Sequence, residues 1–203
     1  MIELKPSFLV GKGLHRECYV HPHQNDLCVK ILFTNDGLKE VAREQAYYKL
    51  LQKRNISWDI LPKFYGNIET NLGSGAVFDL IKDSDGKASK SLEYYLTSIE
   101  ETKLNYSGLS KAFLNLKNSL FHNKIITMTI KAKNIVYKRI NSTDGALIII
   151  DNIGNSDFVP ISNYINFLAE KKILRKWNHF ESSLLAHYPD NDLLKKIISS
   201  QNS

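Results

Sequence analysis

LIIIDNIG, residues 147–154, is an apolar run that ends abruptly at a carboxylate. Its four branched apolar residues in a row predict a strand that is buried on both faces. Asp151 follows this strand directly and Gly154 follows three residues later, so we expect the Asp151 side chain at the rim of a hydrophobic core. A carboxylate in that position is a candidate metal ligand.

A second chemistry-bearing segment lies upstream, where Lys131–Asn134 runs into the apolar residues 135–137. The turn residues NSTDG at 141–145 separate the two apolar pieces and predict a β-hairpin. This hairpin would bring Asn134 and Asp151 side by side. Because amide and carboxylate oxygens suit Mg²⁺ better than a soft metal, the two residues form a candidate magnesium site.

The length and composition favour a cytoplasmic protein. A chain of 203 residues is long enough for one domain or two closely joined lobes. It has no apolar run of about 18 residues, so no transmembrane segment is expected. The first residues lack the pattern of a signal peptide. Cys18 and Cys28 are the only cysteines, and we expect both to be free thiols.

The formal net charge of +6 is compatible with an anionic partner. The basic residues are scattered, however, and the densest group is Lys171–Lys176. No basic patch with interleaved aromatic residues is evident, so nucleic acid is not the expected partner. A solvated helix face is the simplest interpretation of the basic group, and contact with an anionic membrane or nucleic acid is the alternative.

Hydrophobic periodicity divides the chain into a strand-rich lobe at 1–81 and a mainly helical lobe at 82–203. In the first lobe we expect short strands near 8–10, 18–20, 27–33, 61–68 and 75–81, and one helix between 37 and 55. In the second lobe, outside the hairpin, the patterns predict helices at 91–98, 107–121, 162–187 and 190–199. The polar stretch 82–91 is the candidate hinge between the lobes.

Lys30 lies inside the otherwise apolar strand 27–32. If its side chain is buried, the ammonium group needs an anion, because an unpaired buried charge costs several kcal/mol. Glu44, on the helix that follows, is a suitable partner. The alternative is that Lys30 points outward into solvent, and the strand alone does not decide between the two.

Gly11 and Gly13 lie between two expected strands. Glycines at this place would let backbone N–H groups approach phosphate oxygens, although glycines more often serve hairpin turns. Their position ahead of the strand that contains Lys30 strengthens the phosphate-binding interpretation.

The chain resembles the protein-kinase fold in the order of its chemistry-bearing residues. These residues are Gly11, Gly13, Lys30, Glu44, Phe78, Asp79, Lys131, Asn134 and Asp151. More narrowly, the segments IITMTIKAKNI at 125–135 and IIIDNIG at 148–154 resemble the YrbL family of bacterial kinase-like proteins, which is named for the PhoP regulatory network. The resemblance implies an α+β, protein-kinase-like two-lobed fold. It has an antiparallel N-terminal sheet plus one helix and a shortened, mainly helical C-terminal lobe.

The resemblance also implies that ATP and Mg²⁺ bind between the lobes. By position, Gly11 and Gly13 would cover the nucleotide phosphates. Lys30 would contact the α- and β-phosphates while it pairs with Glu44. In this sequence Arg16 takes the place of the third glycine of the kinase loop.

The remaining ligand contacts are assigned by position in the same way. Phe78 would lie behind the adenine, and the backbone of Asp79–Ile81 would contact the base. Asn134 and Asp151 would hold Mg²⁺, and Lys131 would approach the γ-phosphate. These roles follow from the resemblance alone.

Thr129 stands five positions before Asn134, where the kinase catalytic loop has an Asp that accepts the substrate hydroxyl proton. Threonine is no carboxylate base at neutral pH, and loss of a general base costs roughly 10²–10⁴-fold in rate. We therefore expect ATP binding with slow or absent phosphoryl transfer and a regulatory role. The alternative is a pseudokinase-type module that binds a regulatory protein partner and does not need nucleotide.

Overall fold

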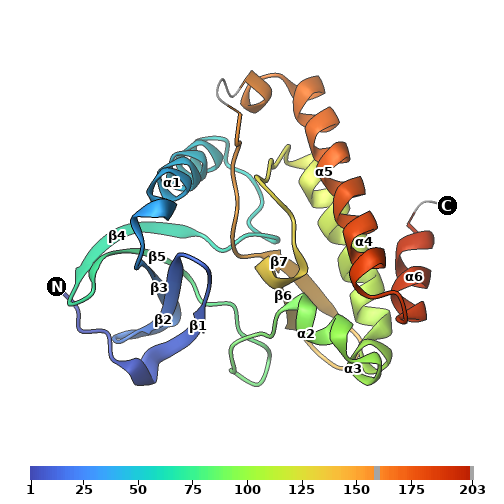
Figure 1. The fold of residues 1–203 in the computed structure, drawn as a ribbon, viewed down its shortest axis with the longest axis horizontal. Helices are drawn as coiled ribbons and strands as arrows, with labels where there is room; N and C mark the ends of the chain where they lie inside the picture. The colour runs from blue at the N-terminus through green and yellow to red at the C-terminus, as the bar shows by residue number, and fades with distance from the viewer. Residues whose placement is uncertain (158–160, 202–203) are drawn as a thin grey trace.

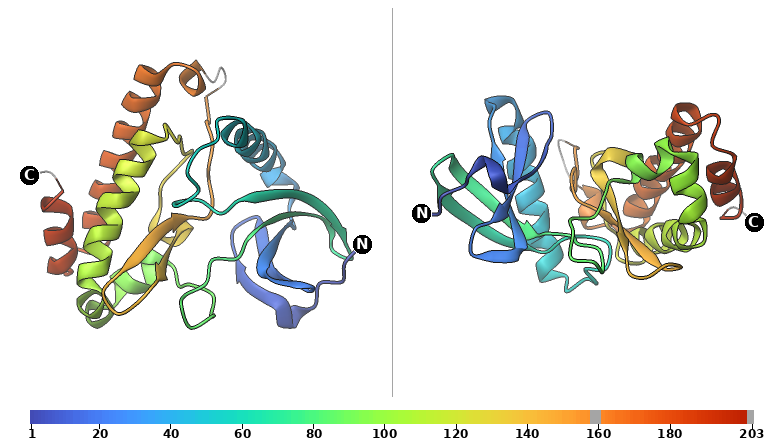
Figure 2. Two further views of the ribbon diagram at one scale, coloured as in Figure 1. Left: turned by 180° about the vertical axis from the view of Figure 1, so that it is seen from behind. Right: turned by 90° about the horizontal axis from the view of Figure 1, so that it is seen from below.

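Two lobes make up the computed structural model, which describes residues 1–157 and 161–201 (Figure 1; Figure 2). The first contains a five-stranded sheet with helix α1 (Leu38–Lys53) beside it, and the second contains the other α-helices around a two-stranded sheet. We call residues 1–81 the sheet lobe and residues 82–201 the helical lobe. The fold is the α+β, two-lobed, kinase-like layout that the resemblance implies.

The five strands of the sheet lobe pair antiparallel, in the order β1-β2-β3-β5-β4. Its strands are β1 (Leu9–Lys12), β2 (Arg16–His21), β3 (Gln24–Leu32), β4 (Phe64–Thr70) and β5 (Gly73–Asp79). Each corresponds to an expected strand. β3 begins three residues earlier than expected, and β4 begins three residues later because Leu61 and its neighbours form a turn.

The two faces of this sheet bury different side chains, because successive residues of a strand point to opposite faces. Val29 and Ile31 belong to a small core on one face, whereas Cys28 and Phe78 belong to the main core on the other. Lys30 lies two residues after Cys28, so its side chain points to the same face of the sheet. Its ammonium group donates a hydrogen bond to the Ile150 carbonyl of the helical lobe. The interpretation that Lys30 points outward into solvent is therefore wrong.

Helix α1 covers the main-core face and connects the sheet to the helical lobe. Its buried residues are Glu44, Tyr47, Tyr48 and Leu51, and their spacing places them along one side of the helix. The Tyr47 hydroxyl accepts a hydrogen bond from the Ile126 N–H at 2.8 Å. The face of α1 that carries Glu44 is thus held against the segment that precedes the hairpin of β6 (Ile135–Arg139) and β7 (Gly145–Ile149).

The expected hinge is anchored to the helical lobe rather than free. Asp83 is only 6% exposed, and its carboxylate accepts from the Ser89 hydroxyl at 2.6 Å and from Arg139 Nε at 2.7 Å. The backbone N–H of Arg139 donates to the same carboxylate at 3.0 Å. Because Arg139 lies on β6, these bonds fix residues 83–89 to that strand.

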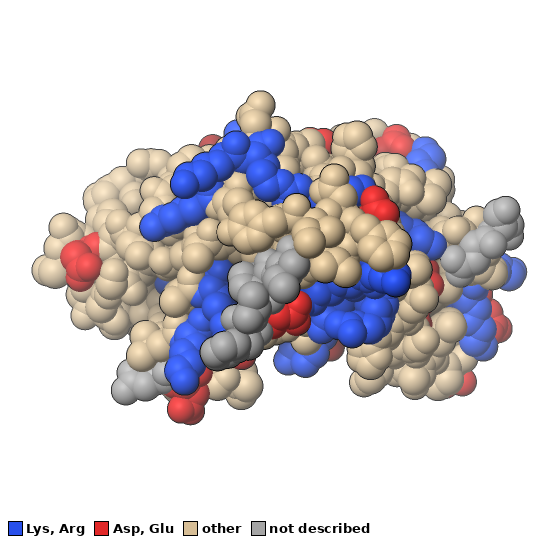
Figure 3. All heavy atoms as spheres, turned by 90° about the horizontal axis from the view of Figure 1, so that it is seen from above, with Lys and Arg blue, Asp and Glu red and all other residues tan. Residues whose placement is uncertain are grey.

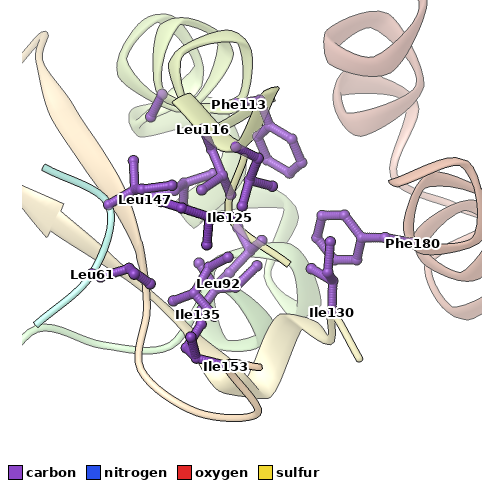
Figure 4. Close-up of a cluster of buried hydrophobic side chains, with 14 of the residues drawn as sticks. Leu61, Leu92, Phe113, Leu116, Ile125, Ile130, Ile135, Leu147, Ile153 and Phe180 are labelled. Atoms are coloured by element: carbon purple, nitrogen blue, oxygen red, sulfur yellow. The ribbon is translucent and has the colours of Figure 1, made fainter. Parts of the chain in front are cut away.

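The helical lobe encloses one small hairpin, made of β6 (Ile135–Arg139) and β7 (Gly145–Ile149). Its helices are α2 (Leu92–Thr97), α3 (Ile99–Leu104), α4 (Tyr106–His122), α5 (Asn166–His187) and α6 (Asp192–Ser199). Side chains from the hairpin, α4 and α5 meet in the main core, where Leu147, Leu116 and Phe180 are each almost completely buried (Figure 4). Leu61 from the sheet lobe belongs to the same core, which therefore continues from one lobe into the other.

Candidate functional site

The β6–β7 hairpin brings Asn134 and Asp151 together. Ile135 pairs with Ile149, and the Ile150 N–H donates to the Asn134 carbonyl at 2.9 Å. Asn134 ends the short 3₁₀ helix η3 (Ala132–Asn134), so the two residues flank the same end of the hairpin. The juxtaposition predicted from the turn residues is confirmed, and the role of the two residues as metal ligands stays a prediction.

The turn after β7 has a backbone that fixes the direction of Asp151. Asn152 has φ of 62° and Gly154 has φ of 128°, and the second value favours glycine. The Asn152 carbonyl accepts from the Met128 N–H at 2.8 Å, and its N–H donates to Asp151 Oδ1 at 2.7 Å. These bonds hold the turn against residues 126–128 and leave the carboxylate directed toward the sheet lobe.

Lys30 reaches across the junction of the lobes to a backbone group. Its Nζ donates a hydrogen bond to the Ile150 carbonyl and lies 4.5 Å from the centre of the Phe78 ring. Burial lowers the pKa of the Lys30 ammonium group, Arg16 lowers this pKa further, and Glu44 opposes the shift. Lys30 is thus close enough to Glu44 to be stabilised by it, yet the expected ion pair between them is not formed.

Arg16 is the residue that pairs with Glu44. Its Nη1 donates to Glu44 Oε2, and its Nη2 donates to Asp151 Oδ1. The Glu44 side chain is 2% exposed and that of Arg16 is 16% exposed, so the pair is nearly buried. The sequence prediction of a Lys30–Glu44 pair is wrong because the longer, forked guanidinium group of Arg16 contacts both carboxylates at once.

Glu44 retains one unused oxygen. Its Oε1 is buried and has no hydrogen-bond partner in the part of the chain that the structure describes. A buried acceptor without a donor costs roughly 1–3 kcal/mol. The site therefore contains an acceptor that a rearrangement or a ligand can satisfy.

The glycine segment forms the turn that delivers Arg16. The Gly13 N–H donates to the Arg16 carbonyl at 2.7 Å, which closes the loop between β1 and β2. A Cβ atom placed on Gly11 would meet no heavy atom within 4 Å, so the space beside this residue is open. Gly13 therefore serves the hairpin turn, whereas Gly11 lies on β1 and pairs with Cys18; contact with phosphate stays a prediction for both.

The expected adenine contacts lie where β5 ends. Phe78 is 1% exposed and belongs to the main core. The Asp79 N–H already donates to the Lys63 carbonyl at 3.2 Å, and the Ile81 carbonyl accepts from the Ser89 N–H at 3.0 Å. The backbone groups assigned to the base by resemblance are thus partly used inside the protein.

The segment that corresponds to the catalytic loop lies beside α5. Thr129 is half-buried, and Lys131 is exposed at the start of η3. Lys176 Nζ of α5 donates to the Met128 carbonyl at 2.5 Å. Burial lowers the pKa of Lys176, and Lys172 lowers it further.

The basic group on α5 is not simply a solvated helix face. Lys172 is 6% exposed, donates to Asn155 and forms an ion pair with Asp157 at 2.6 Å. Figure 3 shows other Lys and Arg side chains exposed on the face seen from above, with acidic groups among them. Lys172 therefore binds the residues that follow the Asp151 turn. The other basic side chains of this group are not assigned such a role.

Arg16 occupies the place that a metal ion at Asp151 Oδ1 would need. Amide and carboxylate oxygens are ligands that Mg²⁺ accepts, but the guanidinium group of Arg16 already holds the Asp151 carboxylate. Within residues 1–157 and 161–201, no three His, Cys, Asp or Glu side chains are grouped so that they could hold a metal. In the same ranges, no helix combines the length and the apolar character that crossing a membrane requires.

Comparison with known proteins places almost the whole chain in one family. A family model described as PhoP regulatory network protein YrbL matches residues 2–185. The uncharacterized protein YrbL of Escherichia coli (strain K12) is 34% identical over 182 residues, which cover 89% of this chain and 86% of that protein. The uncharacterized protein YrbL of Shigella flexneri shows the same identity and coverage.

Proposed function

The chain belongs to the family of the PhoP regulatory network protein YrbL, and from this premise we propose that it is a nucleotide-responsive regulatory protein that binds ATP between its lobes. The observation that carries the proposal is the meeting of two cations from the sheet lobe with the end of β7: Arg16 contacts Asp151, and Lys30 contacts the Ile150 carbonyl. Burial lowers the pKa of Lys30, and charged groups with perturbed pKa values occur at functional sites more often than elsewhere.

Lys30 is the residue best suited to attract a phosphate. Its two contacts, the Ile150 carbonyl and the Phe78 ring, are both uncharged. Its pKa is lowered by burial, so its surroundings do not fully stabilise the positive charge. A phosphate group beside Lys30 would supply the missing negative charge, and nucleotide affinity is therefore expected to depend strongly on this side chain.

Glu44 supports the same proposal from the other side of the site. Its Oε2 accepts from Arg16, whereas its Oε1 is buried without a donor among the described residues. A phosphate ligand that attracts the guanidinium group of Arg16 would leave Glu44 free to pair with Lys30. The orphaned oxygen thus favours a second arrangement of the site, in which the ion pair implied by the kinase resemblance forms.

Phosphoryl transfer is proposed to be slow or absent. Thr129 occupies the position of the catalytic carboxylate, and it provides no base at neutral pH. Lys131 is exposed just before Asn134 and is available to approach a γ-phosphate. The residues of the site therefore support ATP binding more than they support phosphoryl transfer.

A second candidate function is a pseudokinase-type module that binds a regulatory protein and needs no nucleotide. The observation that favours it is the contact of Arg16 with Glu44 and Asp151, which gives each carboxylate a cationic partner without any ligand. The internal use of the Asp79 N–H and the Ile81 carbonyl points the same way.

Thermal unfolding with ATP tests the first candidate against the second. A ligand that binds only the folded state adds about 2.7 kcal/mol of stability at 100 times its dissociation constant. We expect ATP to raise the unfolding midpoint of the natural chain and to have little effect on Lys30→Met. Lys138→Met, at an exposed lysine of β6, is the matched control and should respond as the natural chain does. No response at any ATP concentration would leave the interaction module as the better account.

A further inference from the structure

The cation that the site offers to phosphate is already part of the chain. Arg16 donates to Glu44 with one terminal nitrogen and to Asp151 with the other, so its charge lies between the two carboxylates. A metal bound through Asp151 Oδ1 would require this position. Arg16 is three residues beyond Gly13 and reaches the site because the Gly13 N–H bonds to its carbonyl and closes the turn.

The balance of charge argues against adding a divalent ion. Arg16 and Lys30 are positive, Glu44 and Asp151 are negative, and these four formal charges cancel. A divalent cation at Asp151 would bring two further positive charges next to Arg16 and Lys30. Both of those side chains are only partly exposed to solvent. Like charges repel more strongly in such surroundings than in bulk water.

The guanidinium group also has the donors that a phosphate needs. It carries five N–H donors in one plane, and its two carboxylate contacts use two of them. Arginine binds phosphate oxygens through parallel N–H bonds and remains charged at every relevant pH. By contrast, Asp151 Oδ1 accepts from both Arg16 and the Asn152 N–H, so it is poorly available to a metal.

We propose that Arg16 takes the place of the divalent cation, and that this protein binds nucleotide phosphates without Mg²⁺. This inference rests on the proposed function and specifies the chemistry of its ligand as the metal-free polyphosphate. On binding, the phosphates accept from Arg16 and Lys30, while Asp151 keeps the guanidinium group in position. Asp151, to which the kinase resemblance assigns the binding of magnesium, here positions the guanidinium group of Arg16.

The test compares ATP with excess EDTA and ATP with excess MgCl₂, with the unfolding midpoint and equilibrium dialysis as readouts. The natural chain should bind ATP in EDTA at least as well as in MgCl₂, and MgCl₂ alone should not change the midpoint. Arg16→Met should weaken binding in EDTA by about tenfold or more, the loss expected for a charged hydrogen bond. In MgCl₂ the same variant should lose less affinity, because Asp151 is released to the metal.

Each contrary result has a separate meaning. Binding by the natural chain in MgCl₂ but not in EDTA would overturn the role of Arg16 and leave the nucleotide proposal intact. Unchanged affinity of Arg16→Met in EDTA would also overturn it. Absence of ATP binding under every condition would refute the proposed function as well. If Arg16→Met does not fold, Arg16→Lys replaces it, because lysine keeps the positive charge but lacks the forked guanidinium group. The ATP affinity of the natural chain in EDTA and in MgCl₂ then still shows whether binding needs the metal.

Discussion

The guanidinium group of Arg16 forms an ion pair with the carboxylate of Asp151, 135 positions later in the chain, and so joins the two lobes. Its other terminal nitrogen pairs with Glu44, which is almost completely buried. Together with the bond from Lys30 to the Ile150 carbonyl, this network sets how the sheet lobe meets the helical lobe.

Removal of the Arg16 side chain should destabilise the fold. Arg16→Met leaves the Glu44 charge buried without a counter-charge, and breaking such a pair typically costs 3–5 kcal/mol. Because Arg16 is 16% exposed, we expect a smaller loss, about 2–4 kcal/mol in the free energy of unfolding by urea. Glu44→Gln in the same chain should restore part of this loss, since an amide needs no counter-charge. Full stability of Arg16→Met would show that the pair contributes little.

The Asp83 cluster should give a stability that depends on pH in the acid range. Burial raises the pKa of the Asp83 carboxyl, but the hydrogen bonds from Ser89 and Arg139 outweigh it and the pKa falls below its ordinary value of 3.8. A folded-state pKa below the unfolded value stabilises the fold above the unfolded pKa, and this contribution disappears as the pH falls through the folded-state pKa.

Asp83→Asn should therefore cost about 1–3 kcal/mol at neutral pH, where it removes a charged hydrogen-bond acceptor. The difference from the natural chain should stay constant down to about pH 4 and shrink below it. Urea unfolding at a series of pH values measures it. A difference that grows on acidification would contradict this assignment.

Gly154 is expected to tolerate no side chain. Its φ of 128° lies outside the range that alanine adopts readily, so Gly154→Ala should lower the free energy of unfolding by about 1–3 kcal/mol. Gly11→Ala is the matched control, because nothing lies within 4 Å of a Cβ atom at that position and its φ is not in the left-handed region. Equal stability of the two variants, measured by urea unfolding, would rule out backbone strain at Gly154.

Most of the fold was predictable because its signals are local. Alternating apolar residues define the strands of the sheet lobe, and the turn residues at 141–145 define the hairpin that unites Asn134 with Asp151. The burial of Asp83 was harder to predict, because it depends on Arg139, which lies 56 positions further along the chain. Contacts of this kind follow from the packing of whole elements and not from spacing.

The central contact of the site was missed for a related reason. The sequence showed Lys30 and Glu44 as natural partners, and it showed Arg16 only as a replacement for a loop glycine. The side chain that compensates Glu44 depends on reach and direction across the junction of the lobes, which no local pattern contains. A charged residue in place of a phosphate-loop glycine was nevertheless the signal that could have identified Arg16.

Installing a carboxylate at position 129 should reveal whether the site retains catalytic geometry. The natural chain is expected to hydrolyse ATP or phosphorylate itself very slowly or not at all. Thr129→Asp should raise that rate, because it supplies the missing base near Asn134. Release of phosphate and transfer of label from ATP provide the measurement, with Thr127→Asp as a control at the neighbouring buried threonine. Rapid turnover by the natural chain that persists in Asp151→Ala would place the chemistry elsewhere.

Equilibrium dialysis of labelled ATP against the natural chain and Lys30→Met tests the central claim most directly. The account predicts one ATP bound per natural chain and an affinity reduced by about tenfold or more in Lys30→Met, because the variant loses the ammonium group that faces the phosphates. Lys138→Met should bind as the natural chain does. No saturable binding to the natural chain, or equal affinity in Lys30→Met, would contradict a nucleotide site at the junction of the lobes.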